Sequence, residues 1–283
     1  MPELYISTCA FRGEGIEDVV RIAEANDLSL EFSSGLPYRR NMKEIFLGAA
    51  IPRLAHNYFP APRVPFVLNL ASADDQIRAA SIAHCVSGIR LSTAVAAPFY
   101  SAHAGLCVDP QPSELGRRLE LGSAPVRQVH WELFVESVRE VLSRTSDSRT
   151  MFLIENNVLV QANRFGDGTS PALCVEPSEI LGLLADVADS RLAILLDTAH
   201  LKVSAATLGF DPFEAARRIM SSARCVHHSD NDGTADTNGP LGDGYWFLPL
   251  MRHATHAASV IEVVAQSISS LKEQSRLLSS NQT

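Results

Sequence analysis

The residues of this chain that are best suited to chemistry are histidines and carboxylates that follow short apolar runs. The segment CVHHSDND, residues 225–232, places two adjacent histidines and then two aspartates after such a run. Carboxylate oxygens combined with an imidazole nitrogen are ligands that divalent cations accept. If the fold gathers the ends of these runs, we predict a divalent-metal site there. The polar residues at the run ends are Glu31, His56, His103, Glu155, Asp197, His227 and Glu262.

The apolar runs alternate with segments of helical spacing along the whole chain. In residues 131–142, for example, apolar side chains recur every three or four positions, which indicates an amphipathic helix. Eight strand-then-helix units in 283 residues predict a parallel sheet closed into a single (β/α)8 TIM barrel, with one domain spanning residues 1–283. The expected strands are 4–8, 28–32, 53–58, 98–105, 151–157, 192–200, 223–230 and 258–264.

Loops and helix starts complete this prediction. Polar stretches at 104–128, 158–176 and 228–245 are expected on the face where strands end, which carries the active site in such barrels. We predict Ser178 as the N-cap of the helix at 177–188, and a helix near 246–257. The letters DPFE predict a further helix start, with Asp211 as N-cap, Pro212 in the first turn and Glu214 closing a capping box.

Strand alternation predicts which polar side chains reach the barrel axis. Successive side chains of a strand point to opposite faces, so an inward Glu155, Asp197 or Glu262 directs its aliphatic neighbours toward the helices. The same alternation pairs Cys225 with His227 inward. The two adjacent histidines therefore cannot form a clamp.

The remaining polar residues of segment 225–232 receive other roles. His228 faces outward or begins the loop. Asp230 and Asp232 lie beyond the strand, where we expect turn formation or a substrate contact rather than metal coordination.

Several inward carboxylates cannot remain charged and unpaired in a barrel mouth, because burying an uncompensated carboxylate is costly. Ion pairs with Arg or Lys are the alternative, but among basic residues only Lys202 lies close to these strand ends. A bound divalent cation is therefore the simpler compensation.

Composition narrows the class of protein. A net charge of −8 disfavours nucleic acid as a partner, because such binding depends on Lys and Arg neutralising phosphates. Five scattered cysteines without a CxxC pair indicate reduced thiols rather than a disulfide framework. No apolar run approaches the length of a membrane span, and the first residues lack a signal-peptide pattern. We expect a cytoplasmic protein with no membrane partner.

Several motifs, in this order, resemble the xylose isomerase-like TIM-barrel superfamily. This superfamily includes sugar and sugar phosphate isomerases and epimerases, inosose dehydratases and endonuclease IV. The resemblance spans nearly the whole chain, and the order of the motifs carries more weight than any one of them. They are HNYFPAP (56–62), SAHAG (101–105), IENN (154–157), LLDTAHL (195–201), VHHSDNDG…D.N.PLGDG (226–244) and VIEV (260–263).

The resemblance to the ketose 3-epimerase branch implies a set of metal ligands and a divalent cofactor, with Mn, Zn, Mg and Co as candidates. It also implies that His200, three residues after the aspartate ligand, contacts substrate oxygens. The implied metal ligands are Glu155, Asp197, His227 and Glu262.

Endonuclease IV uses a larger set that holds three zinc ions. The resemblance maps His56, His103 and Asp236 onto this set, as ligands of a second metal or as substrate contacts. The final histidine of the set is replaced by Asn238, and an amide oxygen is a weaker zinc ligand than imidazole. A DNA-repair activity is therefore the less favoured alternative.

The expected activity is that of a metal-dependent isomerase or epimerase of a sugar, sugar phosphate or activated sugar. Glu155 and Glu262 would remove and return a proton beside a polarised carbonyl. The same first step also permits a lyase or dehydratase acting on a keto-sugar or inosose. The resemblance also implies a homo-oligomer as one possible partner state, because the family forms dimers and tetramers, and the sequence leaves the oligomeric state open. Further candidate contacts to the carbohydrate substrate are Lys202, Asn157 and Asn57.

Overall fold

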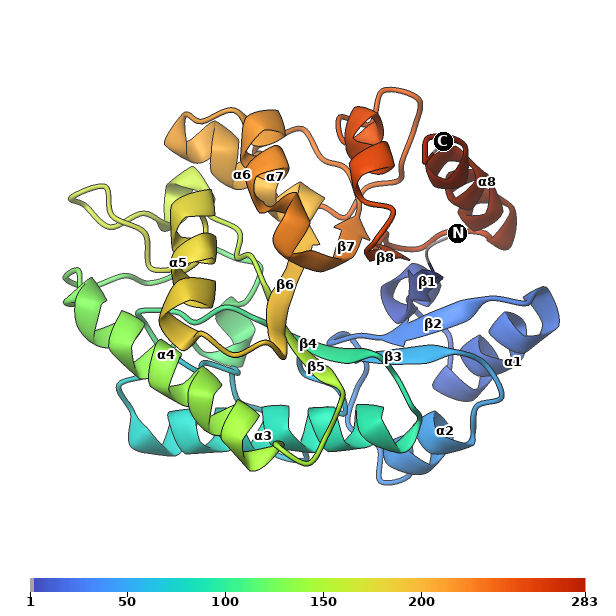
Figure 1. Ribbon diagram of the computed structural model, residues 1–283, viewed down its shortest axis with the longest axis horizontal. Coiled ribbons are helices and arrows are strands. Elements are labelled where there is room, and N and C mark those ends of the chain that lie inside the picture. Colours follow the sequence, from blue (N-terminus) through green and yellow to red (C-terminus); the bar gives the residue numbers. More distant parts are fainter. Residues whose placement is uncertain (1–2, 283) are drawn as a thin grey trace.

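Eight parallel strands close into a barrel in the computed structural model, which describes residues 3–282 (Figure 1). Each strand pairs with the next along the chain, and β8 pairs with β1. The predicted TIM barrel is therefore confirmed. Its strands are β1 (Leu4–Ser7), β2 (Ser29–Phe32), β3 (Arg53–His56), β4 (Phe99–His103), β5 (Met151–Glu155), β6 (Leu192–Asp197), β7 (Ala223–His228) and β8 (Ala258–Ile261).

Helices surround the barrel and cover the outward faces of its strands (Figure 1). The longest two, α3 and α4, lie side by side. Within α3, Gly88 lets the helix approach β4, because a Cβ at this position would lie 2.3 Å from the ring of Tyr100. The helices are α1 (Ile16–Asn26), α2 (Met42–Gly48), α3 (Asp75–Ala94), α4 (Arg127–Arg144), α5 (Pro177–Val187), α6 (Thr198–Leu208), α7 (Pro212–Ile219) and α8 (Ile268–Ser280).

An apolar layer fills the barrel axis below the mouth. The next inward position of the same strands, two residues later, is polar in nearly every case, as the alternation of side chains requires. The polar groups at the mouth therefore rest on a packed apolar floor. This layer consists of Tyr5, Leu54, Ala97, Phe99, Leu153, Ala193, Leu195, Cys225 and Val260.

The sixth strand ends earlier than the sequence predicts. The apolar pattern favours a strand to residue 200, but the strand ends at Asp197, and α6 begins at Thr198. The physical reason is a cap, because the Asp197 carboxylate accepts a hydrogen bond from the backbone N–H of His200 at 2.7 Å. The cap fixes one oxygen of Asp197 and leaves the other directed elsewhere.

Two helix starts follow the predictions only in part. Asp211 caps α7, accepting from the backbone N–H groups of Phe213 and Glu214, but the Glu214 carboxylate contacts Arg217 instead of closing a capping box. Ser178 is not an N-cap, because α5 begins one residue earlier at Pro177, whose ring suits the first helical position. The helix expected near 246–257 is a shorter 3-10 helix, Leu248–His253.

The long loops after β4 and β5 are tied to each other. Leu106 and Ala172 form an antiparallel bridge, and the Cys107 N–H donates to the carbonyl of Pro171 at 2.6 Å. The loop after β7 is closed by a second bridge, between Asp230 and Gly239. Backbone pairing therefore orders these loops around the mouth.

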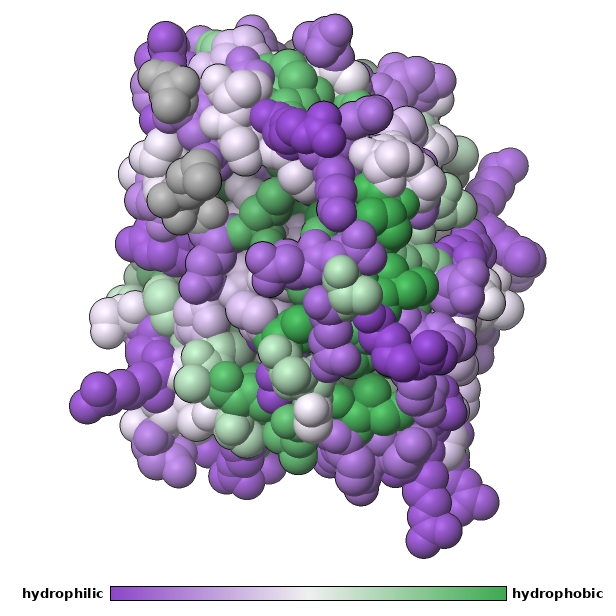
Figure 2. All heavy atoms as spheres, turned by 90° about the vertical axis from the view of Figure 1, so that its right-hand side faces the viewer, coloured by the Kyte–Doolittle hydropathy of each residue, from purple (hydrophilic) through white to green (hydrophobic). Residues whose placement is uncertain are grey.

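The outer surface is mixed in character. On the face at the right of Figure 1, which carries α1 and α8, hydrophilic side chains predominate and apolar ones form a broken band (Figure 2). Among residues 3–282, no helix combines the length and the apolar character that crossing a membrane requires.

Candidate metal centre

Four side chains from adjacent strands meet at the mouth of the barrel. Glu155 ends β5, Asp197 ends β6, His227 belongs to β7 and Glu262 directly follows β8. Each offers one ligand atom, and these atoms lie within 4.8 Å of one another. The first three side chains are fully buried, and that of Glu262 is 13% exposed. The structure thus brings together the four predicted metal ligands.

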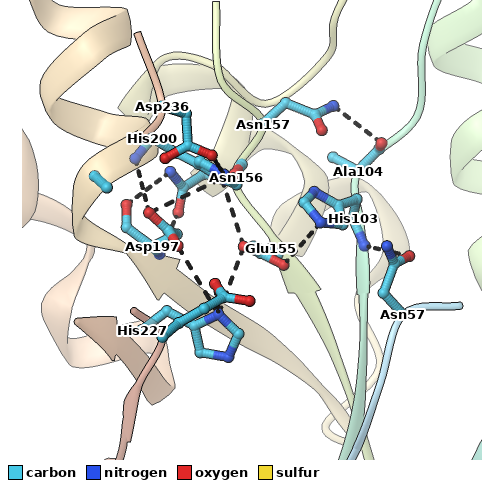
Figure 3. Close-up of polar contacts among 12 residues, drawn as sticks. Asn57, His103, Ala104, Glu155, Asn156, Asn157, Asp197, His200, His227 and Asp236 are labelled. Atoms are coloured by element: carbon cyan, nitrogen blue, oxygen red, sulfur yellow. Dashed lines mark hydrogen bonds and ion pairs between the residues drawn. The ribbon is translucent and has the colours of Figure 1, made fainter. Parts of the chain in front are cut away.

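Glu155 lies at the centre of the cluster (Figure 3). Neither of its carboxylate oxygens accepts a hydrogen bond from residues 3–282. The nearest nitrogens belong to four histidines, at 3.3 Å from His56, 3.4 Å from His200, 3.5 Å from His103 and 3.8 Å from His227. Burial raises the pKa of Glu155 well above its usual range.

One carboxylate oxygen of Asp197 also lacks a hydrogen-bond partner among the described residues. Its Oδ1 caps α6, whereas Oδ2 is buried and accepts no hydrogen bond from the described part of the chain. Burial raises the pKa of this carboxyl to about 6. A bound cation would stabilise these buried carboxylate oxygens in their ionised form, and three carboxylates with one imidazole form a donor set that divalent metals accept. The residues therefore fit a divalent ion.

His227 connects two carboxylates. Its Nδ1 lies 2.9 Å from Oε2 of Glu262, and its Nε2 lies 3.0 Å from Oε2 of Glu31. Burial lowers the pKa of His227, but Glu31 and Glu262 outweigh this effect and hold the pKa well above its usual range. Burial likewise raises the pKa of Glu262, but His227 outweighs it and keeps that pKa below the usual range.

Glu155 also belongs to a second group of residues that could hold a metal ion. His56, His103 and Glu155 also offer ligand atoms within 4.8 Å of one another. Burial lowers the pKa of His56 to about 3 and that of His103 well below its usual range, so both imidazoles are neutral and can donate a lone pair. Ser101, two residues before His103 on β4, lies 2.9 Å from Nδ1 of His56 and leaves Nε2 directed at Glu155.

His200 and Asp236 lie together above this centre (Figure 3). His200 Nε2 lies 3.3 Å from Oδ2 of Asp236, and its Nδ1 lies 2.9 Å from the carbonyl of Asn156. Asn238, two residues after Asp236, turns its amide oxygen to the hydroxyl of Ser229, 3.3 Å away. Asn238, which stands where endonuclease IV has a histidine ligand, therefore pairs with Ser229.

The predicted substrate contact Lys202 is engaged by the loop after β7. Its ammonium group donates to Asp230 at 2.7 Å and to the carbonyl of Asn231. Asp232 is exposed and accepts from the N–H of Thr234 at 2.9 Å, which is a turn contact. A substrate role for Lys202 stays a prediction.

The two predicted asparagine contacts already bond to protein groups. The Asn57 amide group donates to Ser34 at 3.0 Å, and its carbonyl lies 3.5 Å from the N–H of His103. The amide group of Asn157 donates to the backbone carbonyls of Ala104, Gly105 and Leu173 at 2.9, 3.1 and 3.0 Å. Both asparagines therefore tie strand ends together, and their substrate contacts stay predictions.

Three further polar residues contribute to the centre. Asn156 clamps the ends of β5 and β6, since its amide accepts from the N–H of Asp197 at 2.8 Å and donates to its carbonyl at 3.1 Å. Strand alternation could have found Ser101, which shares the inward side with His103. Glu31, predicted as one of the polar residues at the strand ends, is fully buried against His227.

The closed parallel barrel with a cluster of carboxylates and histidines at its mouth identifies the protein as a TIM barrel with a candidate metal centre. Comparison with known families then places the chain, because the family described as xylose isomerase-like TIM barrel matches residues 10–271. The chain belongs to this family. No curated protein matches the sequence.

Solved structures agree with the fold. A D-tagatose 3-epimerase-like protein superimposes with a TM-score of 0.73 at 16% identity, covering 99% of this chain and 96% of the other. D-Psicose 3-epimerase from Clostridium cellulolyticum, solved with D-tagatose, gives 0.66 at 16%, covering 100% and 96%. Endonuclease IV from Thermus thermophilus gives 0.59 at 16%, covering 99% and 98%. At such identities the similarity shows the fold alone.

Proposed function

We propose that this protein is a divalent-metal-dependent isomerase or epimerase of a sugar, sugar phosphate or activated sugar. The observation that carries the proposal is the buried cluster of Glu155, Asp197, His227 and Glu262, with its unpartnered carboxylate oxygens. Two of the similar structures are a D-tagatose 3-epimerase-like protein and D-psicose 3-epimerase, which supports the same class of reaction.

The four residues of the cluster would hold the ion, and Mn, Zn, Mg and Co all accept such donors. When bound, a divalent cation supplies Lewis acidity, which polarises a carbonyl and eases removal of a proton from the neighbouring carbon. The apolar floor beneath the cluster excludes water from below. Substrate therefore approaches from the loop side of the barrel.

Proton transfer is assigned to Glu262 and Glu155. Glu262 is the partly exposed carboxylate, which a substrate can reach from the mouth, so we assign it as the base. Glu155 is the other carboxylate of the pair and is assigned as the group that returns a proton. His200, 3.4 Å from Oε1 of Glu155, would bind a substrate hydroxyl.

The site of proton return decides the product. Return to the same carbon from the opposite face gives an epimer, and return to the adjacent carbon interconverts an aldose and a ketose. Loss of a β-hydroxyl group after the first proton transfer would instead make the protein a lyase or dehydratase of a keto-sugar or inosose. This is the main alternative, and identification of the product distinguishes the three reactions.

A phosphodiester hydrolase of the endonuclease IV kind is the second candidate. The group of His56, His103 and Glu155 favours it, whereas the net charge of −8 and the position of Asn238 oppose it. Elemental analysis of the protein after reconstitution should show at least one tightly held divalent ion per chain. A nicking assay on an abasic duplex should show no cleavage. Nicking would replace the isomerase proposal, and metal content below about a tenth of an equivalent would remove both.

A further inference from the structure

The two ring nitrogens of His227 face different surroundings. Nδ1 points into the four-residue cluster, at 2.9 Å from Glu262 and 3.8 Å from both Glu155 and Asp197. Nε2 points the other way, to Glu31 on β2 at 3.0 Å. Of these carboxylates, Glu31 alone contacts Nε2 and lies outside the cluster.

Among the described residues, Glu31 has few polar partners to offset the cost of burying its carboxylate. Its side chain is fully inaccessible, Oε2 meets His227, and Oε1 accepts no hydrogen bond from residues 3–282. Within that same range, His227 is the single ion-pair partner of this carboxylate. Because this buried carboxylate has one such partner, loss of the contact would destabilise both Glu31 and His227.

The chemistry of the contact determines where the imidazole proton lies. An ionised carboxylate only accepts hydrogen bonds, so without a metal both ring nitrogens of His227, which face Glu262 and Glu31, carry a proton. A cation held by the cluster would displace the proton on Nδ1 and leave the one on Nε2, where Glu31 accepts it. A neutral imidazole has one N–H, and placing it on Nε2 leaves the lone pair of Nδ1 free. Metal-binding histidines commonly donate their other N–H to a carboxylate in this way, which fixes the tautomer and the ring orientation.

We propose that Glu31 is a positioning residue that holds the Nε2 proton of His227 and thereby presents Nδ1 to an ion bound with Glu155, Asp197 and Glu262. The inference rests on the proposed metal site and adds a residue that does not itself touch the ion. Strand β2 thus contributes to a cluster formed by β5 to β8, across the barrel from it.

A different arrangement would make Glu31 a ligand. Glu31, His56 and His227 also offer ligand atoms within 4.8 Å of one another. An ion bound there through Nε2 of His227 would have to replace the contact with Glu31, and Nε2 of His56 is already directed at Glu155, 3.3 Å away. The geometry therefore favours positioning, and the two arrangements differ in the number of ions bound.

The test measures binding of Mn²⁺ and Zn²⁺ to the full chain by competition with a chromogenic chelator. Glu31→Ala should weaken binding about 10- to 100-fold without changing the number of ions bound. Glu31→Gln keeps an acceptor oxygen and should lose less. The matched control is Glu179→Gln, which removes a carboxylate paired with Arg127 and should leave affinity unchanged.

A second measurement does not depend on how the variants fold. In Zn²⁺-loaded wild-type protein labelled with ¹⁵N-histidine, long-range proton–nitrogen spectra should show His227 protonated at Nε2. A proton on Nδ1, or unchanged affinity in both Glu31 variants, would overturn the inference. Loss of one bound ion in Glu31→Ala would make Glu31 a ligand instead. If wild-type protein binds neither metal, the proposed function fails first.

Discussion

Glu155→Gln is expected to lower turnover by about 10³-fold or more, the size of effect typical of losing an acid or base group. Glu155 belongs to two of the three groups of described residues that could hold an ion, and it lies within 3.8 Å of four histidine nitrogens. Glutamine keeps the shape of the side chain but removes the charge that would bind a cation and the carboxylate that would pass a proton to the substrate. The measurement is the initial rate with a saturating substrate, at increasing metal concentration.

The metal titration separates the two roles of Glu155. If the variant remains inactive when its metal site is saturated, Glu155 acts on the proton as well as on the ion. If saturating metal restores activity to within about tenfold of wild type, the acid role is wrong. Glu179→Gln serves again as the control, because its carboxylate pairs with Arg127 away from the cluster.

The same substitution is expected to stabilise the metal-free protein. In the wild type both oxygens of Glu155 are buried without hydrogen bonds, beside Asp197 and Glu262. Glutamine is neutral, so it removes the desolvation cost of a buried charge and its repulsion from Asp197 and Glu262, which should raise the free energy of unfolding by about 1–3 kcal/mol. Urea unfolding in the presence of EDTA measures the difference.

The pH dependence of this gain has a definite sign. Because burial raises the folded-state pKa of Glu155, its favourable contribution is present below the unfolded pKa near 4.5 and is lost as pH rises toward the folded value. The gain in Glu155→Gln should therefore be larger at about pH 8 than at about pH 5. Metal at about 1,000 times its Kd should reverse the order by stabilising the wild type by about 4.1 kcal/mol. A variant less stable than wild type in EDTA would contradict this account.

Strand alternation explains why much of the centre could be predicted from sequence. The inward positions of β5, β6 and β7 follow from a period of two, which places Glu155, Asp197 and His227 on one side, and the closed barrel then brings them together. Glu262 could be placed in the same way although β8 ends one residue earlier. These positions depend on local periodicity and on the fold class alone.

Other features depend on contacts that a sequence does not display. The contact between Glu31 and His227 joins residues 196 positions apart, and it depends on the orientation of one imidazole ring. The early end of β6 depends on whether the Asp197 carboxylate turns back to cap α6, in a segment whose apolar residues suited a longer strand. Asn157 looked available for substrate, but three backbone carbonyls from the neighbouring loops occupy its amide group.

The most direct test of the account is deuterium uptake from D2O into a carbon-bound position of the substrate. Ketoses, their phosphates and nucleotide sugars would be incubated with metal-loaded protein and analysed by mass spectrometry and proton NMR. We predict metal-dependent uptake at one carbon beside the carbonyl, and its loss in Glu262→Gln. Uptake that persists in Glu262→Gln, or in wild-type protein after metal removal, would contradict the proposed metal-dependent mechanism.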